Sequence, residues 1–292
     1  TNRQILLASR PTGWVEESNF KLIETPVPQI ADGQVLVRNH FLSLDPYMRG
    51  RMNDAKSYAA PVNLGDVMVG GTAGEVVASK NPKFAVGEKV VGYLGWQLFG
   101  VSDGAMLMKV DDRHIPLSAY LGSVGMPGVT AWYGLMDICQ PKAGETVVVT
   151  AASGAVGSVV GQLAKMKGCR AVGIAGGAEK CRYVVDELGF DCLFENVGGE
   201  IFDTLLARMN AFSRIALCGL IAQYNTEPWP MKNVGSVLMN RIRMQGFIVS
   251  EHMERWPVAL AELGQGVATA VGMALAERLT SVEIARRETQ PA

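Results

Sequence analysis

Residues 146–157 carry the pattern that most directly predicts chemistry, a run of apolar residues followed by a turn of small ones. Thr-Val-Val-Val-Thr over 146–150 predicts a parallel strand buried on both faces. Ala-Ala-Ser-Gly-Ala-Val-Gly then predicts a tight turn into a helix, the geometry in which backbone N–H groups bind a dinucleotide pyrophosphate. We therefore expect the phosphates to bind at Ser153, Gly154, Ala155, Val156 and Gly157.

The glycines of this turn have separate expected roles. Gly154 lets the backbone approach the phosphates, and Gly157 lets the new helix pack closely on the strand. Ala152 stands where the usual G-x-G-x-x-G pattern has its first glycine, so the letters alone are a weak signal. The alternative is an ordinary strand-to-helix turn that binds nothing. Because the turn lies between a predicted strand and a predicted helix, we favour the nucleotide site over this alternative.

The residues after the next predicted strand, 171–175, indicate which nucleotide binds. NAD sites usually carry an Asp or Glu there, whereas this chain has Gly176, which leaves room for a phosphate. Lys180 lies in the first turn of a predicted helix, 178–188, and could contact the 2′-phosphate of NADP, with Arg182 as a weaker second candidate. Such a contact contributes about 1.5–3 kcal/mol. The alternative is that Lys180 is a solvated surface lysine.

The elements that position these residues fall into two groups. The first 121 residues contain short, glycine-punctuated strands near 34–43, 70–78 and 88–93, which predicts a compact β domain. From 122 to 266, predicted strands alternate with predicted helices (strands 146–150, 171–175, 192–197 and 214–219; helices 130–138, 157–167, 178–188 and 202–209), which predicts a parallel sheet. Residues 267–292 have no clear assignment. Asn196, Cys218, Gly219 and Ile221 follow strand ends and could line the ligand crevice.

Composition excludes several classes of function. The 292 residues carry a formal net charge of −1, which gives no field for holding nucleic acid or an anionic membrane. No basic segment followed by an apolar one opens the chain, so we expect no secretion signal and a cytoplasmic location. No cysteine precedes Cys139, none forms a C-x-x-C pair, and the histidines His40, His114 and His252 are far apart, so we expect no metal site.

Five segments together resemble the zinc-independent medium-chain dehydrogenases and reductases: residues 45–50 (Asp-Pro-Tyr-Met-Arg-Gly), 151–158, 195–199 (Glu-Asn-Val-Gly-Gly), 218–221 and 224–225. Within that family, residues 1–266 are similar to the prostaglandin reductase and alkenal double-bond reductase group, which includes bacterial curcumin reductases. The resemblance implies an α/β protein with a GroES-like β domain and a Rossmann domain with a doubly wound parallel sheet. It also implies a homodimer, NADPH as cofactor, and reduction of the C=C bond of α,β-unsaturated ketones and aldehydes.

This activity requires a donor for the carbonyl oxygen, because hydride transfer to the β-carbon leaves negative charge there. Tyr224 resembles the family's active-site tyrosine, and Tyr47 is expected to line the same crevice from the β domain. The alternative for each is a half-buried aromatic residue whose hydroxyl bonds to backbone. Cofactor contacts are expected at Asn196 and, beside the nicotinamide carboxamide, at Phe247, Ile248 and Val249. Arg49 could be a structural ion-pair residue.

The chain departs from the family pattern in two places. The family has a further strand and helix between the segment ending at Asp191 and the strand beginning at Cys192, and this chain has neither. Residues 271–292 lack the family's final glycine- and lysine-containing segment. Because function depends on the site rather than the fold, alternatives remain: a quinone reductase, a zinc-free alcohol dehydrogenase, or a non-enzymatic NADPH-binding protein.

Overall fold

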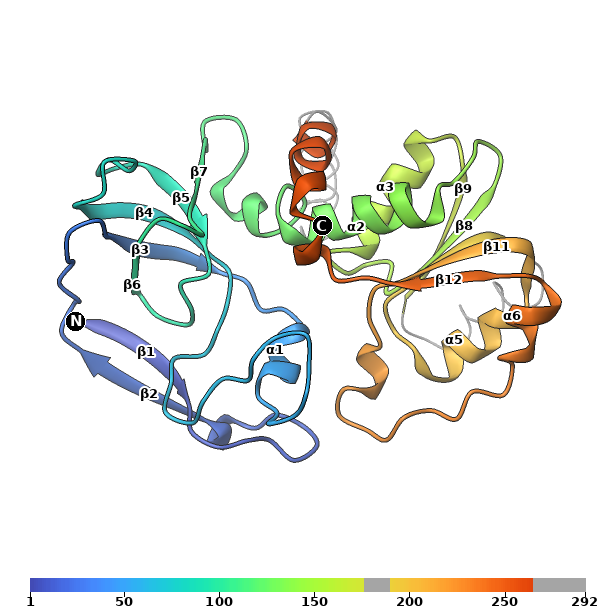
Figure 1. Ribbon diagram of the computed structural model, residues 1–292, viewed down its shortest axis with the longest axis horizontal. Coiled ribbons are helices and arrows are strands. Elements are labelled where there is room, and N and C mark those ends of the chain that lie inside the picture. The colour runs from blue at the N-terminus through green and yellow to red at the C-terminus, as the bar shows by residue number, and fades with distance from the viewer. Residues whose placement is uncertain (176–189, 265–292) are drawn as a thin grey trace, which may run out of the picture.

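A computed structural model of the chain describes residues 1–175 and 190–264 as two domains side by side (Figure 1). The first is a β domain with one short α-helix, α1 (Tyr47–Arg51). Its five-stranded antiparallel sheet has the order β6-β3-β4-β5-β7, and a separate hairpin pairs β1 with β2. The strands are β1 (Asn2–Leu7), β2 (Phe20–Thr25), β3 (Val35–Leu42), β4 (Thr72–Ser79), β5 (Lys89–Gly92), β6 (Phe99–Ser102) and β7 (Met108–Val110).

The second domain has a five-stranded parallel sheet with the order β12-β11-β10-β8-β9. This order reverses between β8 and β10, as in the doubly wound fold expected from the sequence. The strands are β8 (Thr146–Thr150), β9 (Arg170–Ile174), β10 (Phe190–Glu195), β11 (Met209–Leu217) and β12 (Arg243–Gly246). The α-helices are α2 (Met126–Tyr133), α3 (Gly157–Met166), α5 (Gly199–Leu206) and α6 (Gly235–Met239), and residues 256–264 are also helical.

The valine run of β8 lies at the centre of this sheet and contributes to the core on both of its faces. Val148 packs in one cluster with Leu193 and Ile215, while Val147 and Val149 pack in the other. All these side chains are essentially inaccessible to solvent. Burying one Val, Leu or Ile side chain stabilises a fold by about 1.5–3 kcal/mol, so the run expected to form a central strand also anchors the domain.

Two helix predictions need correction. The helix expected over 202–209 is α5, which begins at Gly199 and ends at Leu206, and Met209 already opens β11. The start is earlier because Gly198 adopts a positive φ of 74°, which turns the chain directly from the end of β10 into the helix. The apolar helix expected near 130–138 begins at Met126 and continues as a π-helix, η3 (Gly134–Cys139). The helix expected over 178–188 lies outside the described residues.

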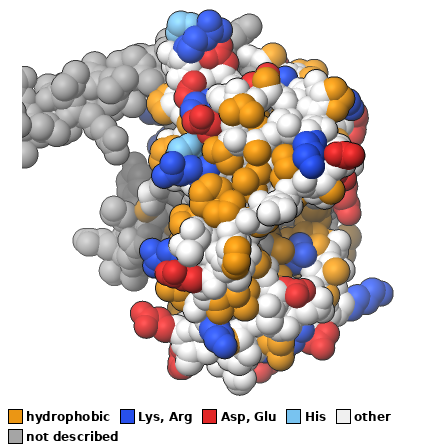
Figure 2. Space-filling view, turned by 90° about the vertical axis from the view of Figure 1, so that its left-hand side faces the viewer, with side chains coloured by type: hydrophobic (Ala, Val, Ile, Leu, Met, Phe, Trp, Pro, Cys, Tyr) orange, Lys and Arg blue, Asp and Glu red, His pale blue; other side chains and the backbone are white. Residues whose placement is uncertain are grey.

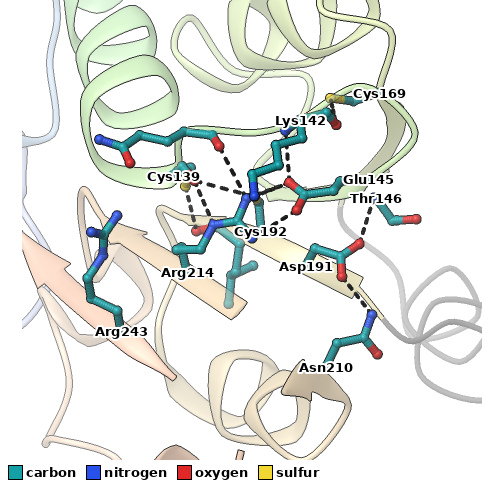
Figure 3. Close-up of polar contacts among 12 residues, drawn as sticks. Cys139, Lys142, Glu145, Thr146, Cys169, Asp191, Cys192, Asn210, Arg214 and Arg243 are labelled. Carbon is teal, nitrogen blue, oxygen red and sulfur yellow. Dashed lines mark hydrogen bonds and ion pairs between the residues drawn. The ribbon is translucent and has the colours of Figure 1, made fainter. Parts of the chain in front are cut away.

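β9 is an edge strand in the described part of the parallel sheet. Within residues 1–175 and 190–264, β9 pairs only with β8. Asp191 secures the start of β10, since its carboxylate accepts from the Thr146 backbone N–H at 3.0 Å and from the Asn210 side chain at 2.8 Å (Figure 3). These contacts connect the start of β10 to β8 and to β11.

An ion pair closes the same end of the sheet, opposite the carboxyl ends of the strands (Figure 3). Arg214 of β11 donates to both carboxylate oxygens of Glu145, and its Nε donates to the Cys139 carbonyl oxygen at 2.8 Å. The arginine therefore ties β11 to the end of η3 and to the residue before β8. Cys139 and Cys192 are buried beside this pair as free thiols.

Several apolar side chains remain on the surface of the β domain. Figure 2 shows them gathered on the end of the molecule that this domain forms. Exposed apolar residues of the domain include Leu22, Leu44, Leu64 and Val86. Within the described part of the chain, no helix combines the length and the apolar character that crossing a membrane would require.

Candidate active site

The turn between β8 and α3 has the tight geometry that its glycines were expected to permit. A Cβ at Gly157 would lie 2.3 Å from the carbonyl oxygen of Ala151, so no side chain fits at this position. Ala151 itself adopts a positive φ of 50°, which is unusual for a residue with a side chain. Gly157 is buried where α3 meets the sheet, as predicted from the sequence.

The outer part of this turn fits the pyrophosphate of a dinucleotide. Ser153, Gly154 and Ala155 are exposed, and the N–H groups of Ser153 and Ala155 find no backbone acceptor among the described residues. They precede the N-terminus of α3, where the helix dipole favours an anion. Val156 is the N-cap of the helix. The residues predicted to bind the cofactor phosphates therefore form a cradle of suitable chemistry.

Glu195 organises the end of the neighbouring strand, β10. Its side chain is fully buried, and Oε1 accepts from the Thr150 hydroxyl at 3.0 Å and from the backbone N–H groups of Val197 and Gly198. Oε2 has no partner among the described residues. Burial raises the pKa of this carboxyl, and the backbone donors oppose that shift. No pattern in the sequence predicts this buried role for Glu195.

Asn196 and the residues after β11 lie beside the end of β10. The Asn196 side chain donates to the Thr150 carbonyl oxygen at 2.8 Å, and the Asn196 backbone carbonyl oxygen accepts from the Ile221 N–H at 3.2 Å. The N–H groups of Cys218 and Gly219 donate to the Glu195 carbonyl oxygen. The structure thus brings the predicted cofactor contacts Asn196, Cys218, Gly219 and Ile221 together at adjacent strand ends.

Tyr224 lies against the same strand ends. A Cβ at Gly219 would lie 3.4 Å from the Tyr224 hydroxyl and 3.4 Å from the Asn196 backbone carbonyl oxygen, so the hydroxyl lies beside Gly219. Burial raises the pKa of the Tyr224 phenol, and a hydrogen bond between its hydroxyl and the Leu220 backbone lowers it, a contact that the alternative considered from the sequence had included. A neutral phenol in this place can donate a hydrogen bond to an oxygen of a bound molecule.

Tyr47 approaches from the β domain, on α1. Its hydroxyl is buried and has no hydrogen-bond partner among the described residues. Burial raises the pKa of the phenol, Asp45 and Tyr93 raise it further, and Arg51 lowers it. A buried donor without a partner is uncommon in proteins and is a site at which a ligand oxygen can bind.

Arg49 joins the two domains beside these tyrosines. Its Nε donates to Asn225 Oδ1 at 2.8 Å, and its Nη2 donates to the Gly13 carbonyl oxygen at 2.9 Å. The alternative considered from the sequence, an ion pair, needs correction, because its partners within the described ranges are amide and carbonyl oxygens. The bond from Arg49 to Asn225 brings α1 against the loop that carries Tyr224. In Figure 1, α1 faces that loop.

Sequence reasoning missed Tyr58 and Arg51. Burial raises the pKa of Tyr58, the nearby Tyr224 raises it further, and Arg51 lowers it, which indicates that Tyr58 lies near Tyr224 across the domain boundary. Tyr58 follows Asp-Ala-Lys-Ser in an irregular loop, so neither periodicity nor a motif could single it out. Arg51 lies four residues after Tyr47 in α1, and that spacing was the available signal.

The remaining predicted residues differ in their surroundings. Phe247 follows β12 and packs on Tyr133 with ring centroids 5.4 Å apart, and Val249 is buried in the same core. Ile248 is partly buried between them. Gly176 and Lys180 lie outside the described residues. Among residues 1–175 and 190–264, no group of three or more His, Cys, Asp or Glu side chains could hold a metal ion.

Several known proteins are similar to this chain in sequence and in fold. Residues 3–110 match the N-terminal domain of oxidoreductase. The NADPH-dependent curcumin reductase of Escherichia coli is 48% identical over 279 residues, which cover 86% of this chain and 81% of that protein. Prostaglandin reductase 1 of Rattus norvegicus is 44% identical over 272 residues, covering 84% and 79%. The crystal structure of CurA from Vibrio vulnificus in complex with NADPH is 45% identical, with a TM-score of 0.84 and coverage of 92% and 88%.

Proposed function

We propose that this chain, which belongs to the zinc-independent medium-chain reductases of the prostaglandin reductase and alkenal double-bond reductase group, reduces the C=C bond of α,β-unsaturated ketones and aldehydes with NADPH. The observation that carries the proposal is the position of Tyr224. Its hydroxyl lies over Gly219 at the end of β11, and the β domain brings Tyr58 close to it. A protein that only bound NADPH would have no need of phenol donors at this place.

NADPH, when bound, supplies the hydride that adds to the β-carbon of the substrate. Tyr224 donates a hydrogen bond to the carbonyl oxygen, on which negative charge develops, and Tyr47 is a second donor from the β domain. Donors already fixed in place stabilise this charge without having to reorganise during the reaction. The α-carbon then takes up a proton, for which a tyrosine hydroxyl or the cofactor ribose 2′-hydroxyl is the source.

The cofactor contacts follow from the cradle described above. We assign the pyrophosphate to the turn 153–157, whose exposed backbone donors support that role. We assign the nicotinamide end to Asn196, Cys218, Gly219, Ile221 and Tyr224, and to residues 247–249. Gly176 and Lys180 would contact the 2′-phosphate. The family resemblance supports a substrate domain over 1–121, a cofactor domain over 122–266, a homodimer and a cytoplasmic location.

A panel of substrates tests the proposal. The purified protein should oxidise NADPH when supplied with a simple enone such as 4-phenyl-3-buten-2-one, and the product should be the saturated ketone. It should be much less active with a quinone, and it should not reduce NADP in the presence of a saturated alcohol. Preference for the quinone or for the alcohol would favour the corresponding alternative enzyme. Tight NADPH binding without turnover of any substrate would favour a non-enzymatic binding protein.

A further inference from the structure

Tyr47 and Arg51 are four residues apart in α1, a spacing that places two side chains on the same face of a helix. Each has a buried polar atom, the Tyr47 hydroxyl and Arg51 Nε, that lacks a hydrogen-bond partner among the described residues. Buried donors are satisfied in the great majority of native proteins. Two unsatisfied donors on one helical face therefore indicate a place where something other than this chain supplies the acceptor.

Arg49, two residues earlier, provides a comparison. Its guanidinium donates to Asn225 of the other domain and to Asn53 and the Gly13 carbonyl oxygen of its own domain. The hydrogen bonds of Arg49 are therefore explained by contacts within the chain. Arg51 makes no side-chain hydrogen bond and no ion pair with any residue in 1–175 or 190–264. Structural arginines that are partly buried normally have such partners. Arg51 is therefore not explained by the stability of the fold.

The charge of Arg51 acts on the phenols of the site. It lowers the pKa of Tyr47 and that of Tyr58, against burial and the neighbouring groups that raise them. Asp45, the acidic residue whose charge acts on Tyr47, opposes this effect. Burial raises the pKa of Asp45 as well, and a hydrogen bond with the Ser43 side chain lowers it. Arg51 is thus the cation whose charge lowers the pKa of the Tyr47 hydroxyl.

We propose that Arg51 is a positioning residue that acts through Tyr47, strengthening the Tyr47 hydroxyl as a hydrogen-bond donor to the enolate oxygen of the substrate. This inference rests on the proposed enone reduction and on Tyr47 as one of its donors. A positive charge beside a phenol stabilises negative charge that builds on the oxygen with which the phenol is hydrogen-bonded, and the effect is larger where water is excluded. Since that charge appears only as hydride is transferred, the interaction favours the transition state over the bound substrate.

A double-mutant cycle on a neutral enone tests this role. We expect Arg51→Met to lower kcat roughly tenfold to a hundredfold, somewhat less than removal of a direct oxyanion donor would, with little change in KM. Arg51→Lys keeps the charge and should recover part of the loss. In a Tyr47→Phe background, Arg51→Met should have almost no further effect, because the hydroxyl through which it acts is gone. The NADPH dissociation constant, from quenching of protein fluorescence, and Tm should be unchanged by Arg51→Met.

Several results would overturn the inference. Full kcat in Arg51→Met, or an equal loss with and without the Tyr47 hydroxyl, would show that Arg51 does not act through Tyr47. A rise in KM confined to enones that carry a carboxylate, with neutral enones unaffected, would instead make Arg51 an anchor for anionic substrates. Failure of the proposed function is distinguishable, because the unaltered protein would then turn over no enone at all.

Discussion

Arg49 donates a hydrogen bond from Nε to Oδ1 of Asn225 at 2.8 Å, and this bond connects α1 of the β domain to the residue that follows Tyr224. The arginine is fixed from its own domain by Asn53 and by the Gly13 carbonyl oxygen. The same contact therefore holds the domains together and sets the position of the tyrosine loop. In a two-domain enzyme, such a contact can control how well donors from opposite sides converge on one oxygen.

Removing the acceptor at Asn225 should lower activity more than cofactor binding. We expect Asn225→Ala to reduce kcat with an enone roughly tenfold or more, because a donor displaced by about 1 Å can cost a hundredfold in rate. Asn225→Asp keeps an acceptor for Arg49 and should retain most of the activity. Steady-state kinetics and the NADPH dissociation constant measure the two effects. Equal kcat values for the unaltered protein and Asn225→Ala would show that this contact does not position the site.

The hydroxyl of Tyr224 should matter mainly in the transition state. Tyr224→Phe removes the hydroxyl, which lies beside Gly219, and keeps the ring. If the hydroxyl is a full oxyanion donor, kcat should fall about a hundredfold, and if it shares the task with another donor, about tenfold. Tyr120→Phe is a matched control, since that hydroxyl donates to the Asp111 carbonyl oxygen and plays no part in the site. A raised KM at unchanged kcat would make Tyr224 a substrate-packing residue instead.

The sequence was most informative where local chemistry has one dominant solution. The valine run and the small-residue turn allowed β8, the turn and α3 to be predicted, because buried parallel strands and phosphate-binding turns tolerate few residue types. Boundaries were less accurate where an unusual backbone conformation decided them. The earlier start of α5 depends on the positive φ of Gly198, which the letters Gly-Gly do not reveal.

Contacts across the domain boundary could not be predicted. Arg49 and Asn225 are 176 positions apart, and Tyr58 lies in an irregular loop, so no periodic pattern relates them to Tyr224. Their proximity results from how two independently folded sheets are docked. The buried role of Glu195 is similar, because a glutamate at a strand end is ordinarily assumed to face solvent. Tertiary arrangement, rather than local propensity, produces these parts of the site.

The preference for NADPH over NADH tests the role of Lys180, which lies outside the described ranges. Lys180→Ala should weaken NADPH binding roughly tenfold to a hundredfold, since a charge-assisted contact to the 2′-phosphate would be lost. NADH lacks that phosphate, so its affinity should hardly change and serves as the internal control. Fluorescence titration with both nucleotides gives the comparison. Equal losses for NADPH and NADH would show that Lys180 does not recognise the 2′-phosphate.

Glu195 should make the stability of the protein depend on pH. Burial raises its pKa above the ordinary value, so the folded state holds the proton more tightly than the unfolded chain does. Its contribution to the free energy of unfolding is thus greatest below the ordinary pKa and declines as pH rises from there toward the raised value. Glu195→Gln imitates the protonated acid and should remove this decline, so its stability relative to the unaltered protein should increase between pH 4 and pH 8. Urea unfolding across that range measures the difference. The opposite result is that Glu195→Gln becomes steadily less stable than the unaltered protein as pH rises. The buried carboxylate would then be ionised and stabilised by the donors from Thr150, Val197 and Gly198.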